Sequence, residues 1–238
     1  MNGTSNVPEP RNEPMWSYAA GSPEKVALKA ELKRIGSSVT DIPMIINGQD
    51  IRTGKVVKVV SPHRHSHHLA NTHQADNRAR TAAIAAARRA QREWASWRFE
   101  DRAAVFLKAA DLLAGPWRQI LNASTMLGQS KTVFQAEIDS ACEIIDFFRF
   151  NVHFAERLYA EQPISSPGMW NRIDHRPLEG FIYAVTPFNF TAIGANLPAA
   201  PALMVNTVVW KPAATAALSN YFVMRLLQEA GLPPGVIN

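Results

Sequence analysis

Asn189 is the residue whose type and setting point most directly to chemistry. It follows the apolar run FIYAVT, behind Pro187 and between Phe188 and Phe190. A carboxamide held in this way at the end of a strand can present an N–H to developing negative charge. The alternative is a capping asparagine that starts the next helix. A second apolar run, TVVWK, ends in a similar way at Lys211.

A β-α-β-α unit would bring these two segments together. FIYAVT is too short for a typical helix and is rich in aromatic and β-branched residues, as expected for a buried parallel strand. An Ala-rich helical stretch to Met204 leads to the second strand, TVVWK, and a second helix over 219–230 ends at Gly231. Ligands in such sheets bind beyond the carboxyl ends of the strands. We therefore expect residues 186–189 and Lys211-Pro212 to lie at one edge.

A layer of helices precedes this unit. The Ala-rich stretch 78–113 predicts a helix, broken near 96–100 and ended by Gly115-Pro116, and a second helix follows over 117–127. The next helix is the most regular, and Glu143 lies on its opposite side from an apolar stripe that we expect to be core. The members of the stripe are Phe134, Ile138, Ala141, Ile145, Phe148 and Val152.

The sequence of the amino-terminal third predicts antiparallel strands. Residues 1–22 are rich in Pro, Gly, Ser and Asn and are expected to form a flexible lead-in, followed by a short helix over 25–35. Asn47-Gly48 between apolar runs is a strong hairpin signal because both residues tolerate a positive φ. A further strand is expected over 55–60. Later in the chain, Pro167-Gly168 predicts a turn between two extended pieces, an edge hairpin.

Other groups of residues favour structural interpretations. The histidines at 63, 65, 67, 68 and 73 could ligate a metal, but no carboxylate or thiol falls within the run, so we expect a surface cluster and no metal site. GQSKT at 128–132 lacks the earlier glycine of a phosphate loop, and no GxGxxG motif is found. Cys142, the one cysteine, lies next to the buried stripe and is expected to be structural.

Composition limits the class of protein. The chain has 238 residues, 47% of them hydrophobic, and no apolar run long enough to span a membrane, so we expect a folded, soluble and cytoplasmic protein. The net charge of +5 is concentrated in the arginines of 78–102. A basic helix face can bind nucleic acid. Here Trp94 and Phe106 give the segment an apolar side to bury, which favours a solvated helix face instead.

Six segments together resemble one family. VTPFNF at 185–190, VVWKPAATA at 208–216 and EAGLPPGVIN at 229–238 resemble the amino-terminal part of the aldehyde dehydrogenase superfamily, over about residues 43–238. Three others are similar to its Δ1-pyrroline-5-carboxylate dehydrogenase branch, which oxidises L-glutamate γ-semialdehyde. These are DRAAVFLKAADLLAGP (101–116), QAEIDSACEIIDFFRFN (135–151) and LEGFIYAVTPFNFTAIGANLPAAPALM (178–204).

The resemblance implies a role for each matching residue. Asn189 would stabilise the oxyanion of the thiohemiacetal, and Lys211 would contact the adenosine ribose of NAD. Thr186, Pro187 and Phe188 would lie along the cofactor. Phe190 would belong to an aromatic box around the aldehyde chain, and Glu143 matches a glutamate near the substrate. Ala213 and Ala214 stand where relatives often carry an acidic or hydroxyl residue, which leaves NAD open against NADP.

The resemblance also implies an α/β fold: the amino-terminal part of a Rossmann-type NAD-binding domain, with a helical layer and an antiparallel oligomerisation hairpin. The family's nucleophilic cysteine and general-base glutamate lie beyond the residues matched here, so we expect no dehydrogenase activity from these 238 residues alone. The open alternatives are a non-catalytic relative acting through oligomer contacts and another aldehyde substrate class. The expected parts are an arm with a short helix (1–42), a strand hairpin and helical layer (43–162), the oligomerisation hairpin (163–179) and the first half of the NAD-binding sheet (180–238).

Overall fold

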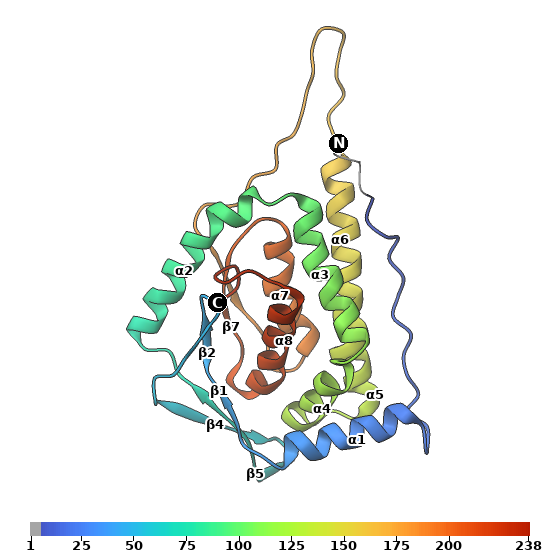
Figure 1. The fold of residues 1–238 in the computed structure, drawn as a ribbon, viewed down its shortest axis with the longest axis vertical. Helices are drawn as coiled ribbons and strands as arrows, with labels where there is room; N and C mark the ends of the chain where they lie inside the picture. Colours follow the sequence, from blue (N-terminus) through green and yellow to red (C-terminus); the bar gives the residue numbers. More distant parts are fainter. Residues whose placement is uncertain (1–5) are drawn as a thin grey trace.

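The computed structural model describes residues 6–238. Two helices lie at its centre. These are α7 (Thr191–Leu203) and α8 (Ala217–Ala230), which lie between a pair of long helices on one side and the strands on the other (Figure 1). The long pair consists of α3 (Phe99–Ala114) and α6 (Ile144–Ala160). No helix within the described residues is long and apolar enough to cross a membrane.

The β-α-β-α unit is confirmed. β6 (Ile182–Val185) pairs in parallel with β7 (Val208–Lys211), and α7 connects them. A short 3₁₀ turn, η2 (Ala214–Ala216), leads into α8, which ends at Gly231 in the left-handed conformation, φ 101°. Ile237 forms a further parallel bridge on the other side of Val208. The sheet at the site therefore consists of two strands and the start of a third pairing.

The predicted hairpin at Asn47-Gly48 is also confirmed. β2 (Met44–Ile46) pairs with β3 (Gln49–Ile51), and the turn residues have φ values of 51° and 74°. The expected strand at 55–60 is β4 (Val56–Ser61), and the histidine run forms its antiparallel partner, β5 (Arg64–His73). β1 (Thr40–Ile42) joins β5 in parallel. The sequence did not predict β1, because its short run carries no periodic pattern.

The helical layer follows the predicted breaks. α1 (Pro23–Gly36) packs against α4 (Arg118–Gln129) at the lower end of the molecule (Figure 1). α2 (Asn77–Ser96) ends at Trp97, where an extended backbone separates it from α3. Gly115 closes α3, as its position before a proline suggested. Thr125 and Gln129 of α4 contact the Thr191 hydroxyl, so α4 lies against the start of α7.

One helix departs from the predicted periodicity. α5 (Val133–Ala136) runs into a π-helix, η1 (Glu137–Glu143), before α6 begins. Four stripe members, from Ala141 onward, are buried as expected, but Phe134 is 64% exposed. Its assignment to the core was wrong because i→i+5 hydrogen bonds widen the helix and rotate the residues before it away from the α6 face. The stripe members that are buried are Ala141, Ile145, Phe148 and Val152.

The amino-terminal arm is held more firmly than its composition suggests. Residues 6–22 run alongside α6 (Figure 1), and the first five residues of the predicted flexible segment lie outside the described residues. The backbone N–H of Glu13 donates to Asp146, and that of Trp16 donates to Glu137. Tyr18 is buried and donates to the same Glu137 carboxylate. Glu137, buried on η1, and Asp146, half-buried on α6, therefore fix the arm.

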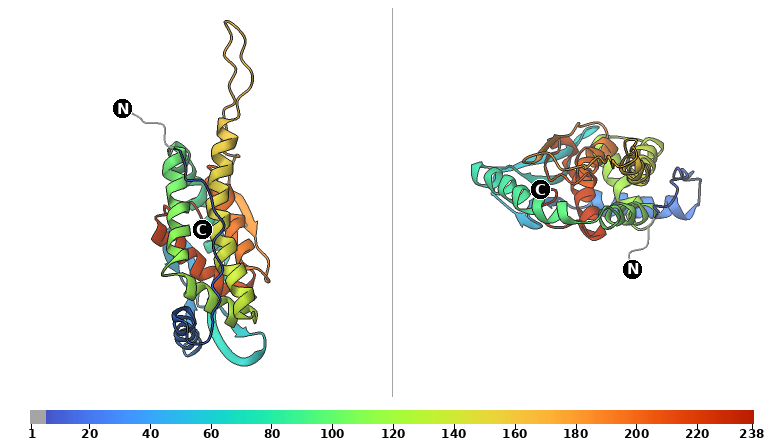
Figure 2. Two further views of the ribbon diagram at one scale, coloured as in Figure 1. Left: turned by 90° about the vertical axis from the view of Figure 1, so that its right-hand side faces the viewer. Right: turned by 90° about the horizontal axis from the view of Figure 1, so that it is seen from above.

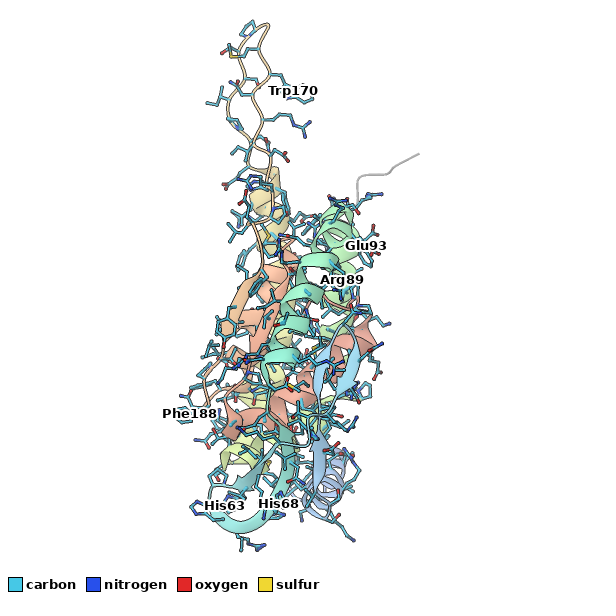
Figure 3. All side chains as sticks on the ribbon, turned by 90° about the vertical axis from the view of Figure 1, so that its left-hand side faces the viewer. His63, His68, Arg89, Glu93, Trp170 and Phe188 are labelled. Carbon is cyan, nitrogen blue, oxygen red and sulfur yellow. The ribbon has the colours of Figure 1, made fainter. Side chains whose placement is uncertain are left out.

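Residues between α6 and β6 form a long hairpin that projects beyond the helices (Figures 1 and 2). Its turn closes with a bridge between Ser166 and Met169, with Gly168 at φ 78°. Ile164 is 91% exposed and Trp170 is 79% exposed. Figure 3 shows Trp170 far from the body of the protein. The hairpin therefore presents apolar side chains to solvent.

Candidate functional site

The carboxyl ends of β6 and β7 lie side by side, as the strand order predicted. Val185 pairs with Lys211, and the Thr186 backbone N–H donates to the Lys211 carbonyl at 3.2 Å. The Trp210 indole N–H donates to Thr186 Oγ1 at 3.1 Å. Thr186 is buried, while Lys211 is exposed and its ammonium has no partner among residues 6–238. One unpaired cation therefore lies at this edge.

Asn189 lies in the exposed segment between β6 and α7. Its side chain makes no hydrogen bond within the described part of the chain, so the capping alternative for Asn189 is wrong. The N-cap position of α7 is Phe190, in an extended conformation and with no side-chain cap. Phe188 is 66% exposed and points away from the body (Figure 3). The Asn189 amide is thus free to bind another group.

Asp139 caps α7 in place of a local residue. Its Oδ1 accepts from the Ala192 N–H at 2.8 Å, and its Oδ2 accepts from the Thr191 N–H at 3.0 Å. The same Oδ2 lies 2.6 Å from Lys131 Nζ. Lys131 comes from GQSKT, so this segment supplies the ion-pair partner of Asp139, the residue that caps α7. The sequence analysis missed Asp139, although an acid beside an apolar stripe was an available signal.

Glu143 ends the π-helix one turn after Asp139. Its carboxylate is half-buried and has no hydrogen-bond partner among residues 6–238. Burial is the main cause that raises its pKa, the negative charges of Asp139 and Asp146 add to the rise, and Lys131 opposes it. The structure therefore brings Glu143, Lys131 and the start of α7 into one region and leaves a carboxylate there without a cationic partner in hydrogen-bond contact.

A groove of about 820 Å³ runs beside Lys211. Lys211 and Pro212 line it together with Tyr183 of β6, and α2 contributes Arg80 and Ile84. Its volume falls within the range of small-molecule sites, about 300–1,000 Å³. Asn189 and Glu143 do not line it. The predicted site residues therefore form two groups, one at Lys211 and the groove, and one at the start of α7.

Cys142 has the structural role that the sequence predicted. Its side chain is buried, and Arg118 Nη2 lies 3.6 Å from its Sγ. Burial, reinforced by the negative charge of Glu137, raises the pKa of the thiol to about 11. A nucleophilic cysteine needs the opposite, a lowered pKa and access to substrate. Cys142 is therefore not equipped to attack an aldehyde.

The histidine run divides among separate partners. His63 contacts the Ser130 hydroxyl at 2.7 Å, His67 contacts the Gly36 carbonyl at 2.7 Å, and His73 contacts Asp41 at 3.1 Å. His63 and His68 lie at the opposite end of the molecule from Trp170 (Figure 3). Within residues 6–238, no group of three or more His, Cys, Asp or Glu could hold a metal ion.

Comparison with known proteins extends these observations. The model of the aldehyde dehydrogenase family matches residues 49–238. Delta-1-pyrroline-5-carboxylate dehydrogenase from Agaricus bisporus is 52% identical over 98% of this chain, and the mitochondrial mouse protein of that name is 50% identical over 95%. The chain covers 43% and 40% of these two relatives, less than half of each.

Solved structures agree. The crystal structure of delta-pyrroline-5-carboxylate dehydrogenase from Mycobacterium tuberculosis, bound with NAD, superposes with a TM-score of 0.98 at 55% identity. The match covers 100% of this chain and 45% of that one. A mutant of the Thermus thermophilus 1-pyrroline-5-carboxylate dehydrogenase gives a TM-score of 0.90 at 31% identity over 98% of this chain and 45% of that one. With a family model over most of the sequence and about half of the residues identical across nearly all of it, the chain belongs to the aldehyde dehydrogenase family.

Proposed function

We propose that the chain is the amino-terminal part of an NAD-dependent aldehyde dehydrogenase that oxidises L-glutamate γ-semialdehyde to L-glutamate in proline catabolism. The observation that carries the proposal is the 52% identity to a delta-1-pyrroline-5-carboxylate dehydrogenase over 98% of the chain. The arrangement of Asn189, Phe190 and Glu143 around the start of α7 supports it. Each of these residues has a role that the chemistry requires.

Asn189 would stabilise the oxyanion that forms when a nucleophile adds to the aldehyde. Its amide is exposed, has no partner within residues 6–238, and precedes the amino terminus of α7 by two residues. A helix amino terminus carries a partial positive charge, which favours negative charge nearby. Hydrogen-bond donors that are already in place where negative charge develops make one of the larger contributions to catalysis.

Glu143 would bind the ammonium group of the substrate. L-Glutamate γ-semialdehyde carries an α-ammonium, whereas a simple aliphatic aldehyde carries no charge. Glu143 is half-buried and its pKa is raised chiefly by burial, so a cation placed beside it would favour the ionised carboxylate. Phe190, 39% exposed, would pack against the aliphatic part of the same molecule.

The residues at the sheet edge fit NAD. Lys211 offers an unpaired ammonium beside a groove, and Thr186 holds the ends of the two strands together. Lys211 would bind ribose hydroxyls, with Thr186, Pro187 and Phe188 along the cofactor. The chemistry that NAD supplies when bound is acceptance of a hydride. The structure of the M. tuberculosis relative is described as bound with NAD, which supports this choice of cofactor.

We further propose that these 238 residues by themselves do not turn over substrate. Their single thiol, Cys142, is buried with a raised pKa, so they supply no activated nucleophile. One observation favours a second function, oligomer contact: the 163–179 hairpin exposes Ile164, Met169 and Trp170, and Trp170 lies far from the body (Figure 3). A homo-oligomer of the complete enzyme would cover such a surface.

A chimera tests the proposal. Residues 1–238 replace the matching part of the M. tuberculosis enzyme, and NADH formation is measured with L-glutamate γ-semialdehyde and, separately, with propionaldehyde. We expect the chimera to reduce NAD when the semialdehyde is supplied, and to prefer the semialdehyde to propionaldehyde. Glu143→Gln should reduce this preference. Asn189→Ala should lower kcat by about 10²–10³-fold. A folded chimera without activity would contradict the proposed function.

Two controls accompany this experiment. The 238-residue chain alone should produce no NADH, and its co-elution with a complete relative would favour the oligomer-contact function. Replacing NAD by NADP in the chimera decides the cofactor preference that Ala213 and Ala214 leave open.

The cytoplasmic location stays a prediction, because the relatives from mouse and Dictyostelium discoideum are named as mitochondrial.

A further inference from the structure

The start of α7 is held by a residue that is 52 positions away in the sequence. α7 has no side-chain cap of its own, and the carboxylate of Asp139 accepts the N–H groups of Thr191 and Ala192 at 3.0 and 2.8 Å. The Asp139 side chain is 2% exposed. A capping carboxylate satisfies backbone donors that a helix otherwise leaves unpaired. Here it also fixes the peptide two residues after Asn189.

Lys131 connects this cap to the aromatic residue of the loop. Its Nζ lies 2.6 Å from Asp139 Oδ2 and 4.2 Å from the centroid of the Phe190 ring. Lys131 itself follows α4, with 15% of its side chain exposed. A largely dehydrated ammonium interacts favourably with both a carboxylate and the face of a ring. One side chain thus joins the end of α4, the π-helix and the site loop.

The Thr191 side chain is fixed independently. Its hydroxyl lies 2.8 Å from Thr125 Oγ1 and 3.1 Å from Ser219 Oγ, and Gln129 donates to it at 2.8 Å. These partners come from α4 and α8 and do not involve Asp139. Removing Asp139 would therefore free the backbone of the first turn while the body of α7 stays in place.

The π-helix places Asp139 and Glu143 on the same side of the chain, four residues apart. The negative charge of Asp139 raises the pKa of Glu143, and the positive charge of Lys131 lowers it. Asp146 is the other acid that acts on Glu143. It binds the amino-terminal arm through Asn12 and the Glu13 N–H and makes no hydrogen bond to α7 among residues 6–238.

We propose that Asp139, held by Lys131, is a positioning residue that fixes the Asn189 loop against the segment carrying Glu143. The catalytic consequence rests on the proposed function, because Asn189 and Glu143 must then meet the two ends of one substrate. A displacement of about 1 Å in such an arrangement can cost on the order of 100-fold in rate. Asp139 and Lys131 themselves need not touch the substrate.

Hydrogen exchange of the 238-residue chain tests the positioning directly. Asp139→Asn should speed exchange of the Thr191 and Ala192 amides by about tenfold or more, with α3 and α6 unchanged. Asp146→Asn is the matched control: the same substitution in the same helical run should leave these two amides unchanged. If Asp139→Asn does not fold, Lys131→Met replaces it, with a smaller increase expected at the same amides. Unchanged exchange at the start of α7 would overturn the proposal.

Titration of Glu143 by carbon-13 NMR separates positioning from general loosening. Asp139→Asn should lower the pKa of Glu143, while Lys131→Met should raise it further, because each removes one of the charges that act on it. Loosening of the structure would expose Glu143 and lower its pKa in both variants. A lowered value in Lys131→Met therefore counts against the proposal.

The chimera supplies the catalytic readout. Asp139→Asn should reduce kcat by about 10–100-fold with KM changed far less, since the substrate groups still bind. Asp146→Asn removes a weaker repulsion of Glu143 but no cap of α7, so it should change kcat far less. An Asp139→Asn chimera with wild-type kcat would contradict the positioning role. If the unsubstituted chimera is inactive, the proposed function fails, while the exchange and titration results still decide whether Asp139 positions the loop.

Discussion

The guanidinium of Arg118 and the carboxylate of Glu137 form an ion pair almost completely shielded from water, with side chains 0% and 1% exposed. The Trp16 N–H and the Tyr18 hydroxyl donate to the same carboxylate, at 2.8 and 2.7 Å. Glu13 contacts Arg118 from the other side. The network joins the amino-terminal arm, α4 and the π-helix. It therefore supports the helical run that carries Asp139 and Glu143.

Replacing Arg118 should destabilise the whole chain. Arg118→Met leaves the buried Glu137 charge without its cation, and breaking a buried pair in this way costs about 3–5 kcal/mol. Urea unfolding followed by circular dichroism measures the loss. Arg34→Met is the matched control because the Arg34–Glu31 pair lies on the surface, with the Arg34 side chain 56% exposed. It should cost less than about 1 kcal/mol. Equal losses in the two variants would show that the buried network adds no stability.

The same network predicts a loss of stability in acid. Burial alone would raise the pKa of Glu137, but hydrogen bonds from Arg118, Trp16 and Tyr18 outweigh it and hold the pKa below its ordinary value. Its stabilising effect is therefore present above the unfolded-state pKa of about 4.3 and disappears as the pH falls through the folded-state value. The urea midpoints of the wild-type chain and Glu137→Gln should converge between pH 6 and pH 3. A constant gap would contradict this.

Local signals explain what the sequence could predict. The Asn47-Gly48 turn, the strand ending at Val185 and the helix end at Gly231 each depend on a few adjacent residues with distinct backbone preferences. The contact between Thr186 and Lys211 then followed from the rule that the carboxyl ends of parallel strands lie at the same edge of a sheet.

Long-range contacts explain what the sequence analysis missed. The cap on α7 comes from Asp139, 52 residues earlier, so no local pattern around Asn189 indicates it. The π-helix breaks the period of 3.6 that placed Phe134 in the core, and its extra residue per turn has no signature in an apolar pattern. Glu137 is buried by Arg118 and by the amino-terminal arm, both distant from it in the sequence.

The thiol of Cys142 should be nearly inert in the folded chain. With its pKa raised to about 11, it is far less ionised at pH 8 than a free cysteine, and it is also buried. Alkylation by iodoacetamide, followed by mass spectrometry, should be more than about 100-fold slower than in urea. Cys142→Ala provides the background, since the chain has one cysteine. Rapid labelling of the folded chain would show that the thiol is accessible.

Gly194→Ala should destabilise the helix that carries the site, because α7 packs closely on α8 at this glycine. A Cβ at Gly194 would overlap Asn220 Oδ1, and Asn220 is buried with its amide donating to the Ala216 carbonyl at 2.9 Å. Since neither the α7 backbone nor the buried Asn220 side chain can move freely, we expect a loss of about 1–3 kcal/mol in the free energy of unfolding.

Gly128→Ala is the matched control in α4. Its Cβ would meet nothing closer than Leu218 at 3.8 Å, so the gain in helix propensity, up to about 1 kcal/mol, should appear without a clash. Thermal unfolding should thus shift in opposite directions for the two alanine variants. The clash at Gly194 is specific to Asn220, so Gly194→Ala should cost less in an Asn220→Ala background than in the wild-type chain. Equal costs in both backgrounds would show that another contact limits the approach of α7 to α8.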